Sequence, residues 1–252
     1  MGIVTRPVVW LSLVLAAGLA VVQWPNLRDL ATYGATRVLP LEERLFAAGK
    51  YQRRVAAHRA ESFSADQPLV VFLGDSLTQN FPLERLLRQP GLVNRGISGD
   101  TTRGVLQRLD TLPNGSSNDV CFLMIGYNDL KYRADSEILA NVRRLVEALL
   151  ARAGEKGTAS VVVQSILPVA SRRSWANQRI RRLNEGLAAL CQERGLQFLD
   201  LHSTFLNVGQ GGIDPALTEG GVHLNDEGYR RWAKGVAPLV KAVLAGPEAK
   251  TP

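Results

Sequence analysis

The stretch PLVVFLGDS, residues 68–76, indicates the fold class of this chain. It is a short apolar run that stops at a glycine-containing turn, which is typical of a strand buried on both faces of a parallel sheet. Four further runs of this kind follow along the sequence, at residues 91–100, 119–129, 159–169 and 196–203. We therefore expect a sheet of five strands.

Amphipathic stretches separate the later strands. Residues 135–151, 176–194 and 226–244 each carry apolar side chains at helical spacing, and Asn225 is a suitable N-cap for the last of them. Strands that alternate with helices predict an α/β fold, a three-layer αβα sandwich with a five-stranded parallel sheet and right-handed crossovers. Such sheets bind ligands at the carboxyl ends of their strands, so the informative residues should lie there.

The composition of this 252-residue chain limits which classes of partner it is expected to bind. Hydrophobic residues make up 46% and charged residues 21%, as in an ordinary globular protein, and the net charge is +7. The Lys and Arg residues are scattered without interleaved aromatics, so no nucleic-acid partner is expected. The sequence contains no CxxC, no HExxH and no histidine cluster, so no metal site is expected. We expect His58 and His202 to be surface or packing residues.

The N-terminus has a different character from the rest of the chain. Residues 8–22, VVWLSLVLAAGLAVV, form a membrane anchor or a signal peptide, and we favour the anchor. We expect residues 1–24 to be this segment, 25–67 a basic helical connector, 68–245 the main domain and 246–252 a mobile tail. The main domain is expected on the extracytoplasmic, periplasmic side, or secreted if the segment is cleaved.

Four polar or glycine positions lie where strands end or where the last helix begins. Taken singly, each has an ordinary role: Ser76 as a helix cap, Gly96 as a turn glycine, and Asn128 in an Asx-turn. His223 precedes the last helix. Together they supply a nucleophile, a base and oxyanion donors, which are the parts that acyl transfer needs.

Four sequence blocks carry a resemblance to the SGNH, or GDSL, hydrolase family. They are GDSL at 74–77, NRGISGDTT at 94–102, GYND at 126–129 and VHLNDEGY at 222–229. The resemblance covers about residues 68–245. NRGISGDTT and QSILPV also resemble the branch that includes the platelet-activating-factor acetylhydrolase catalytic subunits and similar bacterial esterases. The resemblance implies a flavodoxin-like αβα fold and an esterase that requires no cofactor.

The resemblance also implies residue roles. Ser76 would be the nucleophile and His223 the base, while the N–H groups of Ser76 and Gly96 and the Asn128 amide would form the oxyanion hole. Asp75 and Asp129 would support them. Implied substrates are small acyl esters, such as acetyl groups on sugars or lipids.

One position departs from the family pattern. The last block is usually D-x-x-H, and Gly220 stands where the acid is expected. Three interpretations remain open: Glu219 orients His223, with Asp200 a more remote candidate; a backbone carbonyl holds the imidazole; or the chain is a non-catalytic ligand-binding or assembly protein. A nucleotide-binding module is disfavoured because no phosphate-loop motif is present.

Overall fold

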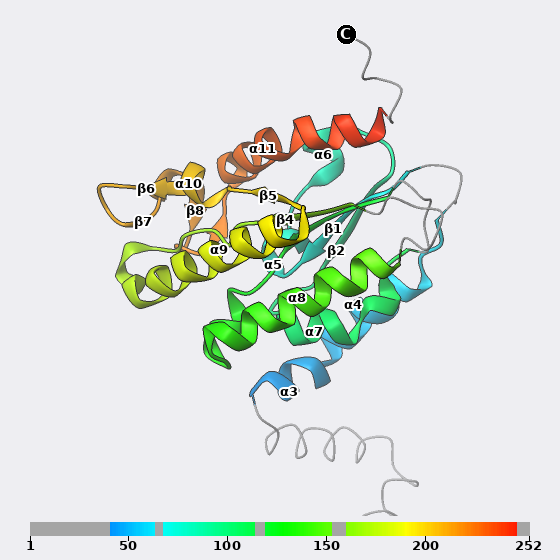
Figure 1. Ribbon diagram of the computed structural model, residues 1–252, viewed down its shortest axis with the longest axis horizontal. Coiled ribbons are helices and arrows are strands. Elements are labelled where there is room, and N and C mark those ends of the chain that lie inside the picture. Colours follow the sequence, from blue (N-terminus) through cyan, green and yellow to red (C-terminus); the bar gives the residue numbers. More distant parts are fainter. Residues whose placement is uncertain (1–40, 64–67, 114–118, 153–159, 246–252) are drawn as a thin grey trace, which may run out of the picture. The chain divides into compact units, whose positions relative to one another are not determined.

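The computed structural model describes residues 41–63, 68–113, 119–152 and 160–245 (Figure 1). The chain divides into two compact units, residues 1–52 and residues 53–252. The described part of the first unit holds helix α3 (Leu41–Ala47) and the first residues of helix α4 (Gly49–Ala60). The second unit holds the sheet.

No helix within the described ranges is long and apolar enough to cross a membrane. The apolar stretch 8–22 and the tail 246–252 lie outside the described residues. The domain boundaries proposed from the sequence stay a prediction.

The five strands form one sheet in which every neighbouring pair is parallel. Their order in the sheet is β2-β1-β3-β4-β5. The strands are β1 (Val70–Gly74), β2 (Leu92–Gly96), β3 (Val120–Met124), β4 (Ser160–Gln164) and β5 (Gln197–Leu199). Because β1 has β2 on one side and β3 on the other, the connections diverge at the carboxyl ends of β1 and β3, where such sheets bind ligands.

Helices α7, α8 and α9 cover one face of the sheet. Their apolar side chains pack against Val71 and Leu73 of β1 and against the strand residues that point the same way. The helices are α7 (Thr102–Gln107), α8 (Asp135–Ala151) and α9 (Ser174–Arg194). The predicted spans of the two long helices are therefore confirmed to within two residues.

Helices α5, α6 and α11 cover the other face, and Figure 1 shows α6 and α11 on the opposite side of the sheet from α7 and α8. Val70 and Phe72 of β1 point toward this second layer, where Trp232 is completely buried. The helices are α5 (Ser76–Gln79), α6 (Leu83–Leu87) and α11 (Asp226–Leu244). The three-layer αβα sandwich expected from the sequence is confirmed.

Short elements complete the described chain. The sequence did not predict the two small hairpins, whose strands of two residues are too short to carry a periodic pattern. The elements are η1 (Leu109–Thr111), η2 (Asn128–Lys131), η3 (Ser171–Arg173), α10 (His202–Phe205), the hairpin of β6 (Leu206–Asn207) and β7 (Gly212–Ile213), η4 (Pro215–Leu217), and the hairpin of β8 (Thr218–Glu219) and β9 (His223–Leu224).

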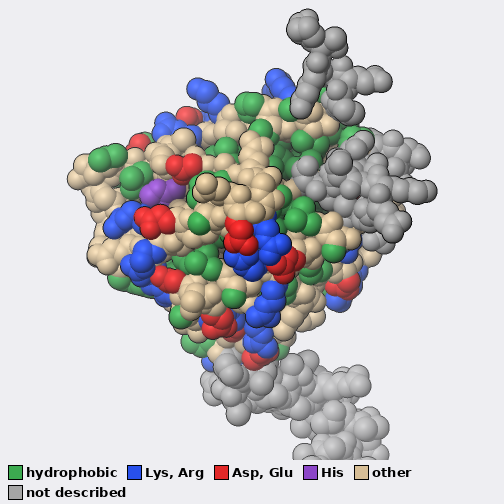
Figure 2. All heavy atoms as spheres, in the orientation of Figure 1, with side chains coloured by type: hydrophobic (Ala, Val, Ile, Leu, Met, Phe, Trp, Pro, Cys, Tyr) green, Lys and Arg blue, Asp and Glu red, His purple; other side chains and the backbone are tan. Residues whose placement is uncertain are grey.

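Charged side chains on the surface are interspersed. On the face that Figure 2 shows, Lys and Arg side chains lie beside Asp and Glu side chains rather than in one basic patch. Examples are the ion pair of Arg143 with Glu193 at 2.6 Å and that of Arg179 with Asp135 at 2.6 Å. Much of the positive charge is thus locally balanced among the described residues.

Candidate active site

The turn after β1 presents Ser76 as the first residue of α5. Asp75 caps this helix, and its carboxylate accepts a hydrogen bond from the Leu77 N–H at 3.0 Å. Gly74 is required by packing, since a Cβ there would lie 2.3 Å from the Met124 carbonyl oxygen. The Ser76 hydroxyl therefore stands at the carboxyl edge of the sheet, beside the point where the connections diverge.

Asn94 fixes the far end of the nucleophile helix. Its amide donates to the Thr78 carbonyl at 2.7 Å and to the Phe81 carbonyl at 3.3 Å. Its side-chain oxygen accepts the Gly96 N–H at 2.9 Å. Sequence reasoning missed Asn94; a polar side chain within an otherwise buried strand was the available signal.

The hydrogen bond between Asn94 and Gly96 affects the role that Gly96 can have. Its N–H is occupied by Asn94, and a Cβ on Gly96 would lie 2.1 Å from the Gln79 nitrogen. Close packing of β2 against α5 is thus a sufficient reason for this glycine. The oxyanion role of Gly96 stays a prediction, and the hydrogen bond argues against it.

Asn128 reaches the Ser76 turn from the end of β3. It is buried at the start of η2, and its amide donates to the Asp100 carbonyl at 3.0 Å and to the Asp75 carboxylate at 3.3 Å. The second contact is long for a hydrogen bond to a carboxylate. The Asn128 amide therefore lies beside the turn of Asp75 and Ser76, and its hydrogen bond to Asp75 is weak.

Two backbone N–H groups near this amide have no hydrogen-bond partner within the described chain. One belongs to Ser76 and the other to Gly99, which adopts a φ of +81° directly before Asp100. A positive φ favours glycine and can turn an N–H toward a ligand. Gly99 is the second glycine of NRGISGDTT, and sequence reasoning missed it.

Buried carboxylates surround Asn128. Burial raises the pKa of Asp75 to about 7; the Leu77 N–H opposes this rise, and the nearby charges of Asp100 and Asp129 add to it. Asp75 therefore changes charge near neutral pH, directly beside Asn128.

Asp129 holds η2 against α7. It accepts hydrogen bonds from the Thr102 N–H at 2.9 Å and the Thr102 hydroxyl at 2.6 Å, and pairs with Arg133 at 2.9 Å. These contacts fix the segment that carries Asn128, which agrees with a supporting role.

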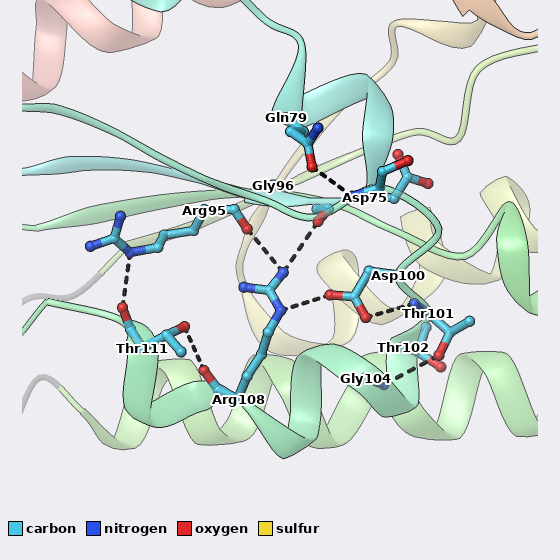
Figure 3. Close-up of polar contacts among 12 residues, drawn as sticks. Asp75, Gln79, Arg95, Gly96, Asp100, Thr101, Thr102, Gly104, Arg108 and Thr111 are labelled. Carbon is cyan, nitrogen blue, oxygen red and sulfur yellow. Dashed lines mark hydrogen bonds and ion pairs between the residues drawn. The ribbon is translucent and has the colours of Figure 1, made fainter. Parts of the chain in front are cut away.

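Arg108 joins the ends of the first two strands. Figure 3 shows its guanidinium between the Asp100 carboxylate, at 2.7 Å, and the backbone carbonyls of Gly74 at 3.2 Å and Arg95 at 2.9 Å. The pair of Arg108 and Asp100 is almost completely buried. This interaction anchors both turns that border the candidate site.

His223 reaches Ser76 from the β8–β9 hairpin. Its Nε2 lies 3.1 Å from the Ser76 Oγ, and no side chain in the described ranges hydrogen-bonds its Nδ1. Glu219 pairs with His223 in the hairpin register. Directly opposed residues of an antiparallel pair project from the same face, with Cβ atoms about 5 Å apart. Glu219 is thus the acidic side chain that the register brings beside the imidazole.

The other orienting candidates lie elsewhere. Asp200 accepts hydrogen bonds from the Ser203 N–H and hydroxyl, and so caps the following turn. Gly220 adopts a φ of +65°, its carbonyl accepts from Arg172 at 3.2 Å, and a Cβ there would meet no atom within 4 Å. The position usually occupied by the acid is therefore open space beside the hairpin. His58 and His202 are both buried.

Two cavities are lined by residues that neighbour Ser76 or His223 in the sequence. A narrow apolar pocket of about 10 Å³ is lined by Asp75, Leu77, Met124, Ile125, Tyr127, Ile166, Leu167, Pro168, Val169 and Val222. A wide groove of about 630 Å³ is lined by Asn80, Pro82, Arg85, Glu219, Leu224, Asn225, Asp226, Glu227, Tyr229 and Arg230. The first cavity is small and mostly apolar, and the second is large and lined by several charged side chains.

Comparisons with known proteins agree with this geometry. The model of the GDSL-like Lipase/Acylhydrolase family matches residues 72–231. The chain is 29% identical over 187 residues to platelet-activating factor acetylhydrolase IB subunit alpha2 of Rattus norvegicus, a match that covers 71% of this chain and 78% of the relative.

Solved structures share the fold. A Streptococcus pneumonia structure described as a platelet activating factor superposes with a TM-score of 0.67 at 27% identity, covering 75% of this chain and 92% of the other. A GDSL-like lipase of Bacteroides thetaiotaomicron gives 0.65 at 21% identity, covering 77% and 99%. The family expected from the four sequence blocks is confirmed. This chain belongs to the GDSL-like lipase/acylhydrolase family and is a hydrolase of ester bonds.

Proposed function

We propose that this chain is a serine esterase that removes small acyl groups through an acyl-enzyme on Ser76. The observation that carries the proposal is the 3.1 Å distance between the Ser76 Oγ and the His223 Nε2. At this distance a neutral imidazole can accept the hydroxyl proton as the oxygen attacks an ester carbonyl. The proton then passes from His223 to the departing alcohol, and water releases the acyl group with His223 again as base.

The oxyanion is stabilised by the Asn128 amide and by backbone N–H groups of Ser76 and Gly99. The long contact of Asn128 with Asp75 supports this role, because that N–H can turn to a developing oxyanion at small cost. We propose Gly99 in place of Gly96, whose N–H is occupied by Asn94. None of these steps draws on a cofactor.

Glu219 orients His223 in the ring position from which Nε2 meets Ser76. The hairpin register supports this assignment, because it puts both side chains on one face of a two-stranded ladder. The carboxylate would accept from Nδ1–H and stabilise the imidazolium that forms during attack. A backbone carbonyl in the same role remains the competing interpretation.

The acyl group is short. The apolar pocket beside Asp75 and Leu77 has a volume of about 10 Å³, which is about what one water-sized group occupies. A pocket of this size admits at most a group about as small as the methyl of an acetyl ester, and a longer acyl chain requires side-chain movement. The similarity to an acetylhydrolase supports the same choice.

The alcohol part of the ester is larger and polar. The groove of about 630 Å³ begins at Glu219 and Leu224, on the two strands of the His223 hairpin, and continues past Arg85 and Arg230. Such a groove suits a sugar or a lipid head group. If residues 8–22 anchor the chain, the enzyme meets esters of the cell envelope on the periplasmic side; a cleaved signal would make it a secreted esterase.

Hydrolysis of p-nitrophenyl acetate tests the mechanism. Wild type should turn over, and Ser76→Ala should lose at least about 10³-fold in kcat/KM because the nucleophile is absent. A Ser203→Ala variant is the matched control, since Ser203 is an exposed serine that only contacts Asp200. Retention of most activity in Ser76→Ala contradicts the proposal.

A second function remains in competition: a non-catalytic ligand-binding or assembly protein on the same scaffold. The absence of a carboxylate at Gly220 motivates it. A fluorophosphonate probe separates the two functions, because only an activated serine is labelled. Labelling of wild type but not of Ser76→Ala supports the esterase, and no labelling of either supports the binding protein.

A further inference from the structure

A group of basic side chains is buried around Arg108, on the side of its guanidinium that faces away from Asp100. It consists of Arg54 and His58 on α4, Arg95 on β2 and Arg108 at the end of α7, and we call it the basic cluster. His58, Arg95 and Arg108 are exposed by only 2%, 1% and 2%, and Arg54 is partly exposed. Arg54 and His58 are four residues apart, so they lie on one face of the helix.

The cluster contains nitrogen atoms that are buried and have no hydrogen-bond partner among the described residues. They are Arg54 Nε, both ring nitrogens of His58, Arg95 Nη2 and Arg108 Nη1. Buried polar groups are almost always paired, and guanidinium nitrogens can only donate. A neutral imidazole donates from one ring nitrogen only, so four of these five atoms are donors that call for an acceptor.

Electrostatics indicates that these groups face one another. The pKa of His58 is lowered to about 3 by burial and then by the charges of Arg95, Arg54 and Arg108. His58 is therefore neutral at every working pH, with one N–H to donate. Figure 3 shows that the unpaired nitrogen of Arg108 points toward the Arg95 side of the site.

The charges of the cluster do not balance within the described residues. Arg95 pairs with Glu61 at 2.7 Å and Arg108 with Asp100 at 2.7 Å. Among the described residues no carboxylate pairs with Arg54, whose Nε is buried without a hydrogen-bond partner. Three guanidinium groups thus face two carboxylates, which leaves one uncompensated positive charge where burial makes it costly.

We propose that the basic cluster is a binding site for one small monovalent inorganic anion of the chloride type. The anion accepts hydrogen bonds from the free nitrogens of Arg54, His58, Arg95 and Arg108 and cancels the extra charge. A single water molecule supplies acceptors but no charge, so it satisfies only half of this requirement. Because Arg108 also holds the carbonyls of Gly74 and Arg95, the bound anion stiffens the strand ends that carry the catalytic turn.

Thermal unfolding of the full chain tests the site. Sodium chloride replaces sodium gluconate at constant ionic strength, so that general screening is unchanged. A specific site predicts a saturable rise in Tm, about 5–10 °C when chloride reaches about 100 times its Kd. Bromide should act in the same way. Equal Tm values in chloride and gluconate overturn the proposal.

Matched variants locate the effect on the protein. Arg54→Gln should weaken chloride binding at least tenfold, while Arg59→Gln should leave it unchanged. Arg59 lies on the same helix but pairs with Asp110 at the exposed surface. A chloride response that survives Arg54→Gln, or that both variants lose, refutes the assignment to this cluster.

A direct measurement removes any dependence on how stable the variants are. Broadening of the ³⁵Cl NMR line by the folded protein reports chloride exchange at a protein site. Wild type and Arg59→Gln should broaden the line, and a bromide titration should reverse it. Arg54→Gln, verified as folded by circular dichroism, should not, and comparable broadening by this variant contradicts the proposal.

Discussion

The two members of the proposed catalytic pair, Ser76 and His223, are held to very different degrees. Ser76 lies in a turn fixed by the Asp75 cap, by Asn94 and by Arg108, all within the sheet unit. His223 is exposed on a hairpin whose strands have two residues each, and among the described side chains its ring hydrogen-bonds Ser76 alone. The nucleophile is preorganised by many contacts, whereas the base depends on few.

This difference indicates at which positions of the site a substitution should have a small effect. Loss of one contact at the nucleophile turn should alter the geometry of a buried network, which is costly. Loss of one contact at the exposed hairpin should cost little, because solvent screens and replaces it. Gly220, which stands where the family pattern usually has the acid, thus lies in the half of the site where a substitution should have the smaller effect.

The largest effect is expected on the nucleophile side, at Asn128. Asn128→Ala removes an amide directed at the developing oxyanion and should lower kcat by about 10²–10³ with little change in KM. Steady-state kinetics with p-nitrophenyl acetate measures it. Asn141→Ala is the control, because Asn141 is also a buried amide but contacts Thr102. Equal losses in both variants would point to general destabilisation instead.

The second effect is a dependence of the free energy of unfolding on pH, and it comes from Asp75. Its pKa is about 7 in the folded protein against an ordinary value of 3.8, so between these values the folded chain keeps a proton that the unfolded chain has lost. The free energy of unfolding should therefore fall as pH rises from about 4 to about 7, by at most about 4 kcal/mol.

Urea unfolding at a series of pH values measures this dependence. Asp75→Asn cannot titrate, so the slope between pH 4 and 7 should become flatter in the variant than in wild type. An unchanged slope would show that Asp75 is not the group responsible.

A smaller effect is expected on the base side, at Glu219. If Glu219 orients His223, Glu219→Gln should lower kcat by no more than about fivefold, because an exposed ionic contact contributes about 0.2–1 kcal/mol. The loss should shrink at high salt. Glu227→Gln, an exposed acid of the same groove that pairs with Arg230, is the control. No loss in Glu219→Gln would favour a backbone carbonyl as the partner of His223.

The smallest expected effect is a gain of activity, produced by a substitution at Gly220. Gly220→Asp restores the usual acid position, where a side chain meets no atom within 4 Å and where the φ of +65° is one that aspartate tolerates. In the Glu219→Gln background it should recover activity, by about the few-fold that the first substitution removed. Gly220→Asn keeps the shape without the charge. Equal recovery by both variants would mean that charge is not the missing element.

The sequence predicted most of the sheet unit because its signals are local. The apolar runs end where the strands end, and Asn225 caps α11 through the Gly228 N–H at 2.9 Å, as expected. The four blocks also gave the family. The hairpin of β8 and β9 was not predictable, since two-residue strands have no period to detect.

The sequence by itself determined the fold class and the family, and it predicted Ser76 as the nucleophile and His223 as the base, because buried strands and short motifs are properties of adjacent residues. Only the tertiary structure decided which N–H groups are free. The Asn94 side-chain oxygen accepts the Gly96 N–H, whereas the Gly99 N–H has no partner among the described residues. The hairpin register brings Glu219 beside His223. These outcomes depend on residues that are distant in sequence or paired across strands, and hydrogen bonds between such residues are set by packing rather than by local pattern.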